Sequence, residues 1–340
     1  RISELSVDPT GHYALFNVRS TDMEANKGKR ALWLKDLAKP ATPEVWLNVS
    51  SGGTSDAQWS PDGKTIYFLS ARGKEKTMQL WKTDITGNNA EQVTKLPLDI
   101  GSYRITPDGT GLVFSLAVFP DAGADEIAGT VRRHAEKPSG SGTVYNKVFV
   151  RHWDTWADGT RNHLFYLSLT TPDAKPVALT PGFDGDVPSQ PFGDAGDYCI
   201  TPDSKTVYFS AREAKTTEPW STNFDIYSVA ISGGPLTDLT TTNKAWDASP
   251  RVSPDGSTLA YKAMKRPGFE ADRFEIQLRD ASGRVRALAP NWDRSVEDMQ
   301  WSRDGSSLLV TANDVGCQRL FRINVASGEV TTLSRDGHID

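Results

Sequence analysis

The stretch WSPDGKTIYFLSAR, at residues 59–72, joins a tryptophan, a four-residue turn and a run of large apolar residues. Pro61 fixes φ at about −65° at the first corner of the turn. Asp62 can accept a hydrogen bond from the backbone that follows, and Gly63 tolerates the positive φ that closes the turn. The run TIYFL at 65–69 is β-branched, aromatic or apolar, as in a strand that is covered on both faces. We predict that PDG is the hinge between two adjacent strands.

The same pattern recurs along the chain. VDPTGHYALFNV begins at 7, ITPDGTGLVFSL at 105, ITPDSKTVYFSA at 200, VSPDGSTLAYKA at 252 and WSRDGSSLLVTA at 301. Between the hinges lies a second unit, such as QLWKTDITGNNAEQVTKL from 79 and FDIYSVAISGGPLTDLTT from 224, in which a Gly or Asn turn joins two further strands. Four short strands in a period of 46 to 49 residues, measured between hinge glycines, are the signature of a β-propeller blade.

We therefore predict an all-β fold, a β-propeller of four-stranded blades. The approximate blades are 1–50, 51–98, 99–182, 183–241, 242–290 and 291–334, and a seventh begins at 335 with RDGHID. Six complete blades and the start of another indicate a seven-bladed ring that is cut short, since an unpaired end exposes sheet edges. A second count divides the third unit at WADGTRNHLFYL (156–167) and places seven blades within the chain.

Charge and composition limit the partners. The formal net charge of the 340 residues is −5, so we expect neither nucleic acid nor an anionic membrane as a partner. No apolar run reaches the length of a membrane helix. The chain starts at Arg1 rather than Met, which indicates a processed product or an excised segment. Of the 2 cysteines, Cys199 and Cys317, we favour two buried free thiols over a disulfide, and we predict no metal site and no cofactor.

The third repeat contains extra material. Asp108 and Asp203, the hinge aspartates on either side of it, are almost two periods apart. We place an insertion at 120–145, with a short helix around 123–136, followed by the dense polar and aromatic run RHWDTW at 151–156. Insertions in propellers lie on a rim and are candidates for function.

Two clusters are candidate substrate-binding sites. In RHWDTW, a strand would place Arg151, Trp153 and Thr155 on one face, and His152, Asp154 and Trp156 on the other. In TTEPWSTNFDIY (216–227), the candidates are Glu218, Trp220 and Asn223. A carboxylate here, or Asp125 or Glu126 in the insertion, could hold a ligand ammonium. The competing interpretations are a blade strand that only packs and a loop shaped by Pro and Asn.

No catalytic motif is present in the chain. It has no G-x-S-x-G nucleophile elbow and no strand-helix alternation of a hydrolase sheet, and its 5 histidines are scattered. The glycine-rich SGSGT lacks the Lys of a phosphate loop. We predict no catalytic residue in this chain.

With YNKVFVRHWDTWADG (145–159) and EPWSTNFDIY (218–227) set among SPDG hinges, the chain resembles the N-terminal propeller of bacterial peptidases of the prolyl oligopeptidase family. The branch it resembles is the dipeptidyl-peptidase 5 and acylaminoacyl-peptidase type. The resemblance implies a serine exopeptidase that releases dipeptides or acylated amino acids from peptide N-termini. Its propeller caps a C-terminal α/β-hydrolase domain that carries Ser, Asp and His, restricts access to short or unstructured peptides, and orients the substrate N-terminus.

The same resemblance points to a periplasmic or secreted protein, leaves a cytoplasmic location open, and is compatible with an oligomer. This chain ends before any hydrolase domain, so enzymatic activity of the segment alone stays uncertain. The alternative function is a non-catalytic, protein-binding propeller of the TolB type. A third, an enzyme with its site on the propeller axis, predicts carboxylates or metal ligands on several inner strands. We disfavour it because we place the starts of the inner strands at Trp59, Ile105, Ile200, Val252 and Trp301.

Overall fold

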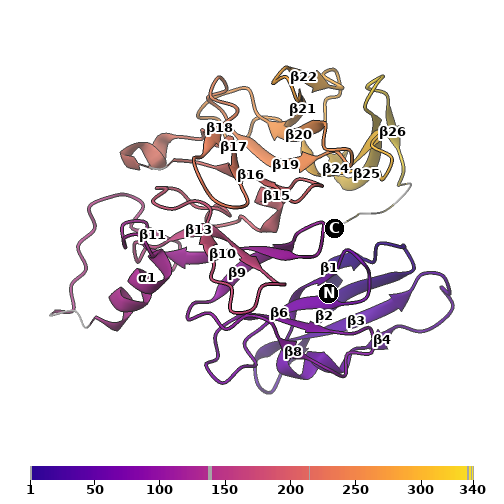
Figure 1. Cartoon of the computed structure of the whole chain (residues 1–340). Coiled ribbons are helices and arrows are strands. Elements are labelled where there is room, and N and C mark those ends of the chain that lie inside the picture. Colours follow the sequence, from indigo (N-terminus) through magenta and orange to yellow (C-terminus); the bar gives the residue numbers. More distant parts are fainter. Residues whose placement is uncertain (1, 137–139, 214, 335–336, 338, 340) are drawn as a thin grey trace.

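The computed structural model describes residues 2–136, 140–213, 215–334, 337 and 339, and over these residues the chain forms six four-stranded antiparallel sheets. The sheets follow one another as the blades of a propeller (Figure 1), which confirms the predicted fold class. Blades 1 to 3 consist of β1 (Ile2–Val7), β2 (Tyr13–Asp22), β3 (Lys27–Asp36), β4 (Val45–Trp46); β5 (Ser55–Trp59), β6 (Ile66–Ser70), β7 (Gln79–Thr83), β8 (Glu91–Gln92); and β9 (Ile100–Ile105), β10 (Gly111–Val118), β13 (Arg161–Ser168), β14 (Val177–Ala178).

Blades 4 to 6 have the same order from the axis outward. They consist of β15 (Tyr198–Ile200), β16 (Thr206–Ala211), β17 (Asp225–Ala230), β18 (Thr237–Asp238); β19 (Asp247–Val252), β20 (Thr258–Ala263), β21 (Glu275–Asp280), β22 (Val285–Leu288); and β23 (Val296–Trp301), β24 (Ser307–Asp314), β25 (Cys317–Asn324), β26 (Val330–Thr332). Short 3-10 helices lie at η1 (Asn48–Gly52), η2 (Ala195–Asp197) and η3 (Lys215–Trp220).

The insertion in the third repeat lies between β10 and β13. It contains α1 (Glu126–Ala135), within the predicted helical segment, and a small hairpin of β11 (Arg151–His152) and β12 (Thr155–Trp156). Among the described strands, these two pair only with each other, and β13 continues blade 3 by pairing with β10. The count that divides the third unit into two blades is therefore wrong.

The seventh blade stays a prediction. Of the residues from 335 onward, 335–336, 338 and 340 lie outside the described residues. Ile339 N–H donates to Gln318 O at 3.0 Å. The N–H groups of Ile100 and Asp247, which open the inner strands of blades 3 and 5, bond in the same way to Met78 O and Phe224 O in the blade before.

The PDG hinges form one ring around the axis. Gly63 has φ 70° and donates its N–H to Ser60 O at 2.9 Å, as the turn requires. Four of the hinge glycines face the proline of the preceding hinge, in the pairs Gly63 with Pro9, Gly109 with Pro61, Gly256 with Pro202, and Gly305 with Pro254. Blades 3 and 4 are joined by the bond from Asp108 N–H to Ser204 Oγ, and blade 6 meets blade 1 where Arg303 donates to Pro9 O.

The hydrophobic core lies between neighbouring blades. One cluster joins Leu80 of blade 2 to Tyr103 and Phe114 of blade 3, and another joins blades 5 and 6. The tryptophan that precedes two of the hinges adds a polar link: Trp59 Nε1 donates to Ser6 O of blade 1 at 3.3 Å, and Trp301 Nε1 donates to Arg251 O of blade 5 at 2.9 Å.

The two cysteines do not form a disulfide. Both cysteines are free, as favoured from the sequence, but only Cys199 is buried, whereas Cys317 is half-buried. Within the described residues, no helix, α1 included, is long and apolar enough to cross a membrane.

Candidate functional site

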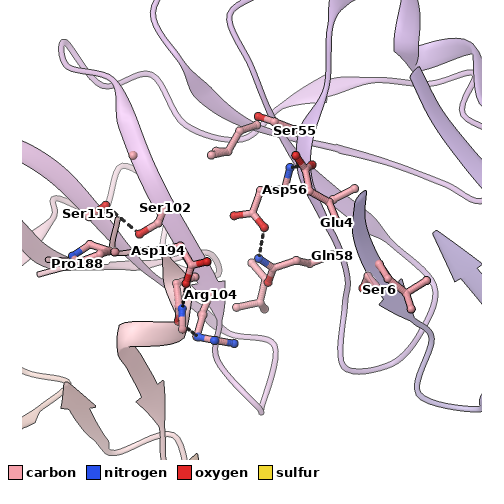
Figure 2. A pocket seen from close by; sticks show the side chains of 18 of the residues that line it. Glu4, Ser6, Ser55, Asp56, Gln58, Ser102, Arg104, Ser115, Pro188 and Asp194 are labelled. Atoms are coloured by element: carbon pink, nitrogen blue, oxygen red, sulfur yellow. Dashed lines mark hydrogen bonds between the residues drawn. The ribbon is translucent and has the colours of Figure 1, made fainter. Parts of the chain in front are cut away.

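A cavity of about 1020 Å³ lies on the propeller axis, and the first segment of every blade contributes to its wall. Figure 2 shows Asp56, Glu4 and Gln58 on one side of this cavity, facing Arg104 and Asp194 on the other. We name it the axial cavity. Its charged lining residues are Glu4, Asp56, Arg104, Asp194, Arg251 and Asp298.

Most of these residues occupy two fixed positions in the repeat. The first position is seven residues before the hinge glycine and is occupied by Glu4, Asp56, Ser102 and Asp298. The second position is five residues before it and is occupied by Ser6, Gln58, Arg104, Arg251 and Gln300. Positions two apart in a strand share a face, so both sets point toward the axis. The signal that could have found the site was this constant offset from PDG.

The sequence pattern hides these residues, because the conspicuous Trp or Ile before a hinge marks the end of an inner strand and not its start. Trp59, Ile105 and Trp301 end β5, β9 and β23 rather than begin them, as do Ile200 in β15 and Val252 in β19. Carboxylates do recur at the axis, at Glu4, Asp56 and Asp298, so the prediction that the inner strands lack them is wrong. Within the part of the chain that the structure describes, no three His, Cys, Asp or Glu side chains are placed to share a metal ion.

Two of the carboxylates differ in how well their charge is compensated. Glu4 accepts bonds from Asn17 Nδ2 at 2.6 Å and Asp56 N–H at 2.7 Å, and it pairs with Arg30 Nη1 at 3.0 Å. Asp56 is half-buried and accepts a bond from Gln58 Nε2 at 3.1 Å. Burial raises the pKa of Asp56 to about 6, and the nearby charge of Glu4 adds to the rise. A cation at Asp56 would therefore stabilise its ionised form.

Both arginines donate to backbone carbonyl groups, and Arg251 also pairs with a carboxylate. Arg104 Nε donates to Ala195 O at 2.7 Å and to Tyr198 O at 2.9 Å. Arg251 Nη1 donates to Gly196 O at 2.8 Å, while its Nη2 reaches Asp298 Oδ1 at 3.3 Å. Both guanidinium groups thus hold the segment that leads into β15.

The run RHWDTW forms a tight hairpin instead of the predicted continuous strand. Trp153 has φ 45° in its turn, and Arg151 Nη1 donates to Trp153 O at 2.6 Å. The predicted alternation of faces is therefore wrong. Trp156 stacks on Tyr145, with ring centroids 6.0 Å apart, and His152 contacts Phe149. Asp154 lies in the exposed turn.

The acidic candidates are engaged within the protein. Glu218 pairs with Arg161 Nη2 at 2.8 Å and lies 3.6 Å from Arg212 Nη2. Asp125 caps α1 by accepting a bond from Ala128 N–H. Glu126 is only 3% exposed and pairs with His163. Near Glu218, Trp220 is exposed, and Asn223 Nδ2 donates to Asp225 Oδ2 at 2.7 Å.

None of the ten predicted substrate-binding residues is among those that line the axial cavity. Trp153 comes nearest by contact, because its ring lies 5.5 Å from that of Phe192. Phe192 in turn stands between Pro191 and Gly193, which both line the cavity. Trp153 and Phe192 are 69% and 79% exposed, so they form an open aromatic pair beside the cavity.

Comparison with known proteins gives relatives over nearly the whole chain, although no protein-family model matches. The chain is 29% identical over 349 residues to a probable dipeptidyl-peptidase 5 of Aspergillus clavatus, which covers 95% of this chain and 47% of the relative. The chain thus spans about half the length of the curated relatives that it matches.

Two solved structures share the fold. An acylaminoacyl peptidase of Pyrococcus horikoshii superposes with a TM-score of 0.68 at 16% identity, over 98% of this chain and 46% of that one. TolB from Acinetobacter baumannii superposes with a TM-score of 0.51, also at 16% identity, over 99% of this chain and 64% of that one.

Proposed function

We propose that this homologue of dipeptidyl-peptidase 5 is the propeller part of a serine exopeptidase that releases dipeptides or acylated amino acids from peptide N-termini. The observation that carries the proposal is the 29% identity over 95% of the chain to a protein named for that activity. The rest of the parent protein would be a C-terminal α/β-hydrolase domain, with a serine nucleophile, a histidine base and an oxyanion hole. A periplasmic or secreted location belongs to the same proposal.

The propeller's share is to restrict access and to position the substrate amine. Asp56 is the best-suited carboxylate for that amine, because it is half-buried and its side chain accepts a hydrogen bond from the neutral amide of Gln58. A substrate ammonium would supply the missing counter-charge through a charge-assisted hydrogen bond. An amine held at a fixed distance from the nucleophile selects the second peptide bond by proximity. Glu218 is less suited because Arg161 already neutralises it.

The experiment is to compare Asp56→Asn, Glu218→Gln and the matched control Glu75→Gln in the full-length parent. Glu75 is an exposed carboxylate in the connection between β6 and β7, and it is not among the residues that line the axial cavity. We expect Asp56→Asn to lower kcat/KM for dipeptide anilides with a free N-terminus by about tenfold or more, mainly through KM, because it removes a charged partner of the amine. Activity on N-acetylated substrates and the control variant should stay unchanged.

Equal loss on free and acetylated substrates would show that Asp56 does not hold the amine. In that case Arg151, Asp154 and Glu218 are the next residues to replace, and unchanged specificity constants in all of them would remove the amine-positioning role from this chain.

The alternative function is a non-catalytic binding propeller of the TolB type. It is tested by reading the coding sequence beyond Asp340. A further blade followed by G-x-S-x-G and later Asp and His is the result expected for the peptidase. A stop codon soon after a further blade would overturn the peptidase proposal and leave the binding function.

A further inference from the structure

Blade 4 carries an insertion inside its inner strand. In blades 3, 5 and 6 the strand opens with a residue whose N–H bonds to the blade before, and the hinge glycine follows nine positions later: Ile100 and Gly109, Asp247 and Gly256, Val296 and Gly305. In blade 4 the equivalent residue is Val187, which bonds to Asn162 O at 2.7 Å, yet the hinge residue Ser204 is seventeen positions away. Blade 4 is therefore eight residues longer at this point.

The neighbouring blade locates the extra residues. When Val187 is aligned with Ile100, the sequence IGSY at 100–103 of blade 3 corresponds in blade 4 to Val187 followed by GDY at 196–198. Gly101 and Gly196 both line the axial cavity, as equivalent positions should. The insertion is therefore PSQPFGDA, residues 188–195, which we name the axial loop.

The axial loop forms a wall of the cavity. Six of its eight residues line the cavity, namely Pro188, Gln190, Pro191, Gly193, Asp194 and Ala195. In Figure 2, Pro188 and Asp194 lie on the same wall as Arg104, opposite Asp56. The insertion thus occupies space at the axis that the shorter inner strands of the other blades leave open.

Side chains from both neighbouring blades hold the loop. From blade 3, Arg104 Nε donates to Ala195 O at 2.7 Å and Asn162 Nδ2 donates to Pro188 O at 3.0 Å. From blade 5, Arg251 Nη1 donates to Gly196 O at 2.8 Å. Within the segment, the Ser189 hydroxyl donates to Asp197 Oδ2 at 2.7 Å. Both ends of the loop are therefore fixed, and its two prolines limit its backbone further.

We propose that the axial loop is a fixed constriction that sets the size of the molecules admitted to the axial cavity, so that short peptides enter and folded chains do not. The cavity volume of about 1020 Å³ lies near the upper limit of small-molecule sites, which suits a short peptide. The biological meaning rests on the proposed function, because it names the element that restricts substrates. The constriction itself is a property of this chain and is testable in it alone.

The test measures how fast thiol reagents of two sizes reach the cavity. In a background that carries Cys199→Ser and Cys317→Ser, Ser55→Cys places a thiol on the cavity wall, and Ser51→Cys places a matched thiol on the exposed surface. Each is labelled with a small methanethiosulfonate and with a polyethylene-glycol maleimide. Deleting residues 188–195 joins Val187 to Gly196 and restores the spacing of blade 3.

We expect the deletion to raise the rate of the large reagent, relative to the small one, by about tenfold or more at position 55, because a wall of the cavity is removed. The same ratio at position 51 should not change. An unchanged ratio at position 55 overturns the proposal, since it would mean that the loop does not limit access.

A second variant covers the case in which the deletion prevents folding. Gln190 lines the cavity and its side chain is exposed, so Gln190→Trp adds bulk at the constriction without entering the core. It should slow both reagents at position 55 and neither at position 51; no slowing overturns the proposal. In the parent protein, the deletion should raise cleavage of long substrates relative to dipeptide anilides. A parent without peptidase activity would refute the proposed function while the labelling result stands.

Discussion

The pairing of Glu126 with His163 gives a prediction that separates a structural role from a ligand-binding one. Glu126 Oε2 lies 3.0 Å from His163 Nδ1, and Glu126 Oε1 accepts the Gly182 N–H at 2.8 Å. His163 Nε2 lies 2.8 Å from Phe183 O, and the His163 side chain is fully buried. Both ring nitrogens therefore face oxygen acceptors. One proton must lie between the carboxyl group and the imidazole for all three hydrogen bonds to form.

Glu126→Ala and Glu126→Gln should differ sharply in stability. Alanine leaves the Gly182 N–H and the buried His163 Nδ1 without their protein partners. Because the exposed Gly182 N–H can bond to water, the loss comes mainly from His163 and is about 1–3 kcal/mol. Glutamine keeps all three bonds: its carbonyl accepts the Gly182 N–H, its amide donates to His163 Nδ1, and His163 Nε2–H donates to Phe183 O. We expect it to change the free energy of unfolding by less than about 1 kcal/mol.

The assay is urea and thermal unfolding of both variants followed by circular dichroism, with activity of the parent on dipeptide anilides as the second readout. A structural Glu126 predicts a lower urea midpoint for Glu126→Ala only, and unchanged kcat/KM for Glu126→Gln. If Glu126 instead holds a substrate ammonium, Glu126→Gln loses activity at full stability. Equal stability of Glu126→Ala and the unaltered chain would refute the reasoning.

Three further substitutions test the fold. Burial raises the pKa of Asp247 to about 7, so the native state binds more protons than the unfolded state between about pH 4 and 7. The free energy of unfolding therefore falls as pH rises through that window. Asp247→Asn should abolish this pH dependence and stabilise the protein at pH 8 by about 2–4 kcal/mol, which a comparison of Tm at pH 5 and pH 8 measures. Trp301→Phe removes the bond to Arg251 O and should cost about 1 kcal/mol in urea unfolding, and a Tm equal to that of the unaltered chain would contradict the interblade link. Gly109→Ala, at φ 73°, should cost about 1–2 kcal/mol in the same assay without altering thiol access at position 55, and an unchanged midpoint would contradict the need for glycine at the hinge.

The propeller and its blades could be predicted because each hinge has its own local chemistry. Pro, Asp and Gly specify the PDG turn without help from distant residues, so the period survives even where one hinge carries Ser204 instead of glycine. The axial cavity depends on where each inner strand begins, which no turn marks. Trp59 and Trp301 are the most visible residues of their strands, yet they lie at the ends next to the hinge.

The hairpin and the axial loop escaped prediction for different reasons. The turn of the hairpin has Trp153 at positive φ, followed by Asp154. Tight hairpin turns usually contain Asn-Gly or another Gly, so the sequence here did not indicate a turn. The axial loop lies within the fourth blade, between the hinges of blades 3 and 4. Its eight residues therefore only lengthened blade 4, and nothing in PSQPFGDA shows that the extra length points inward rather than to the rim.

The two departures from the repeat come from consecutive parts of the chain and meet in space. The hairpin belongs to the insertion of blade 3, the axial loop belongs to blade 4, and they touch where the ring of Trp153 lies 5.5 Å from that of Phe192. Blades 5 and 6 keep the regular spacing of their inner strands and supply Arg251 and Asp298, which support the loop rather than extend it. The irregular sector stands opposite Asp56, so it gives the cavity a second asymmetric wall, and we expect it to contribute with Asp56 to the orientation of a bound peptide. Substitutions at Trp153 or Phe192 should therefore change selectivity among substrates more than they change the stability of the ring.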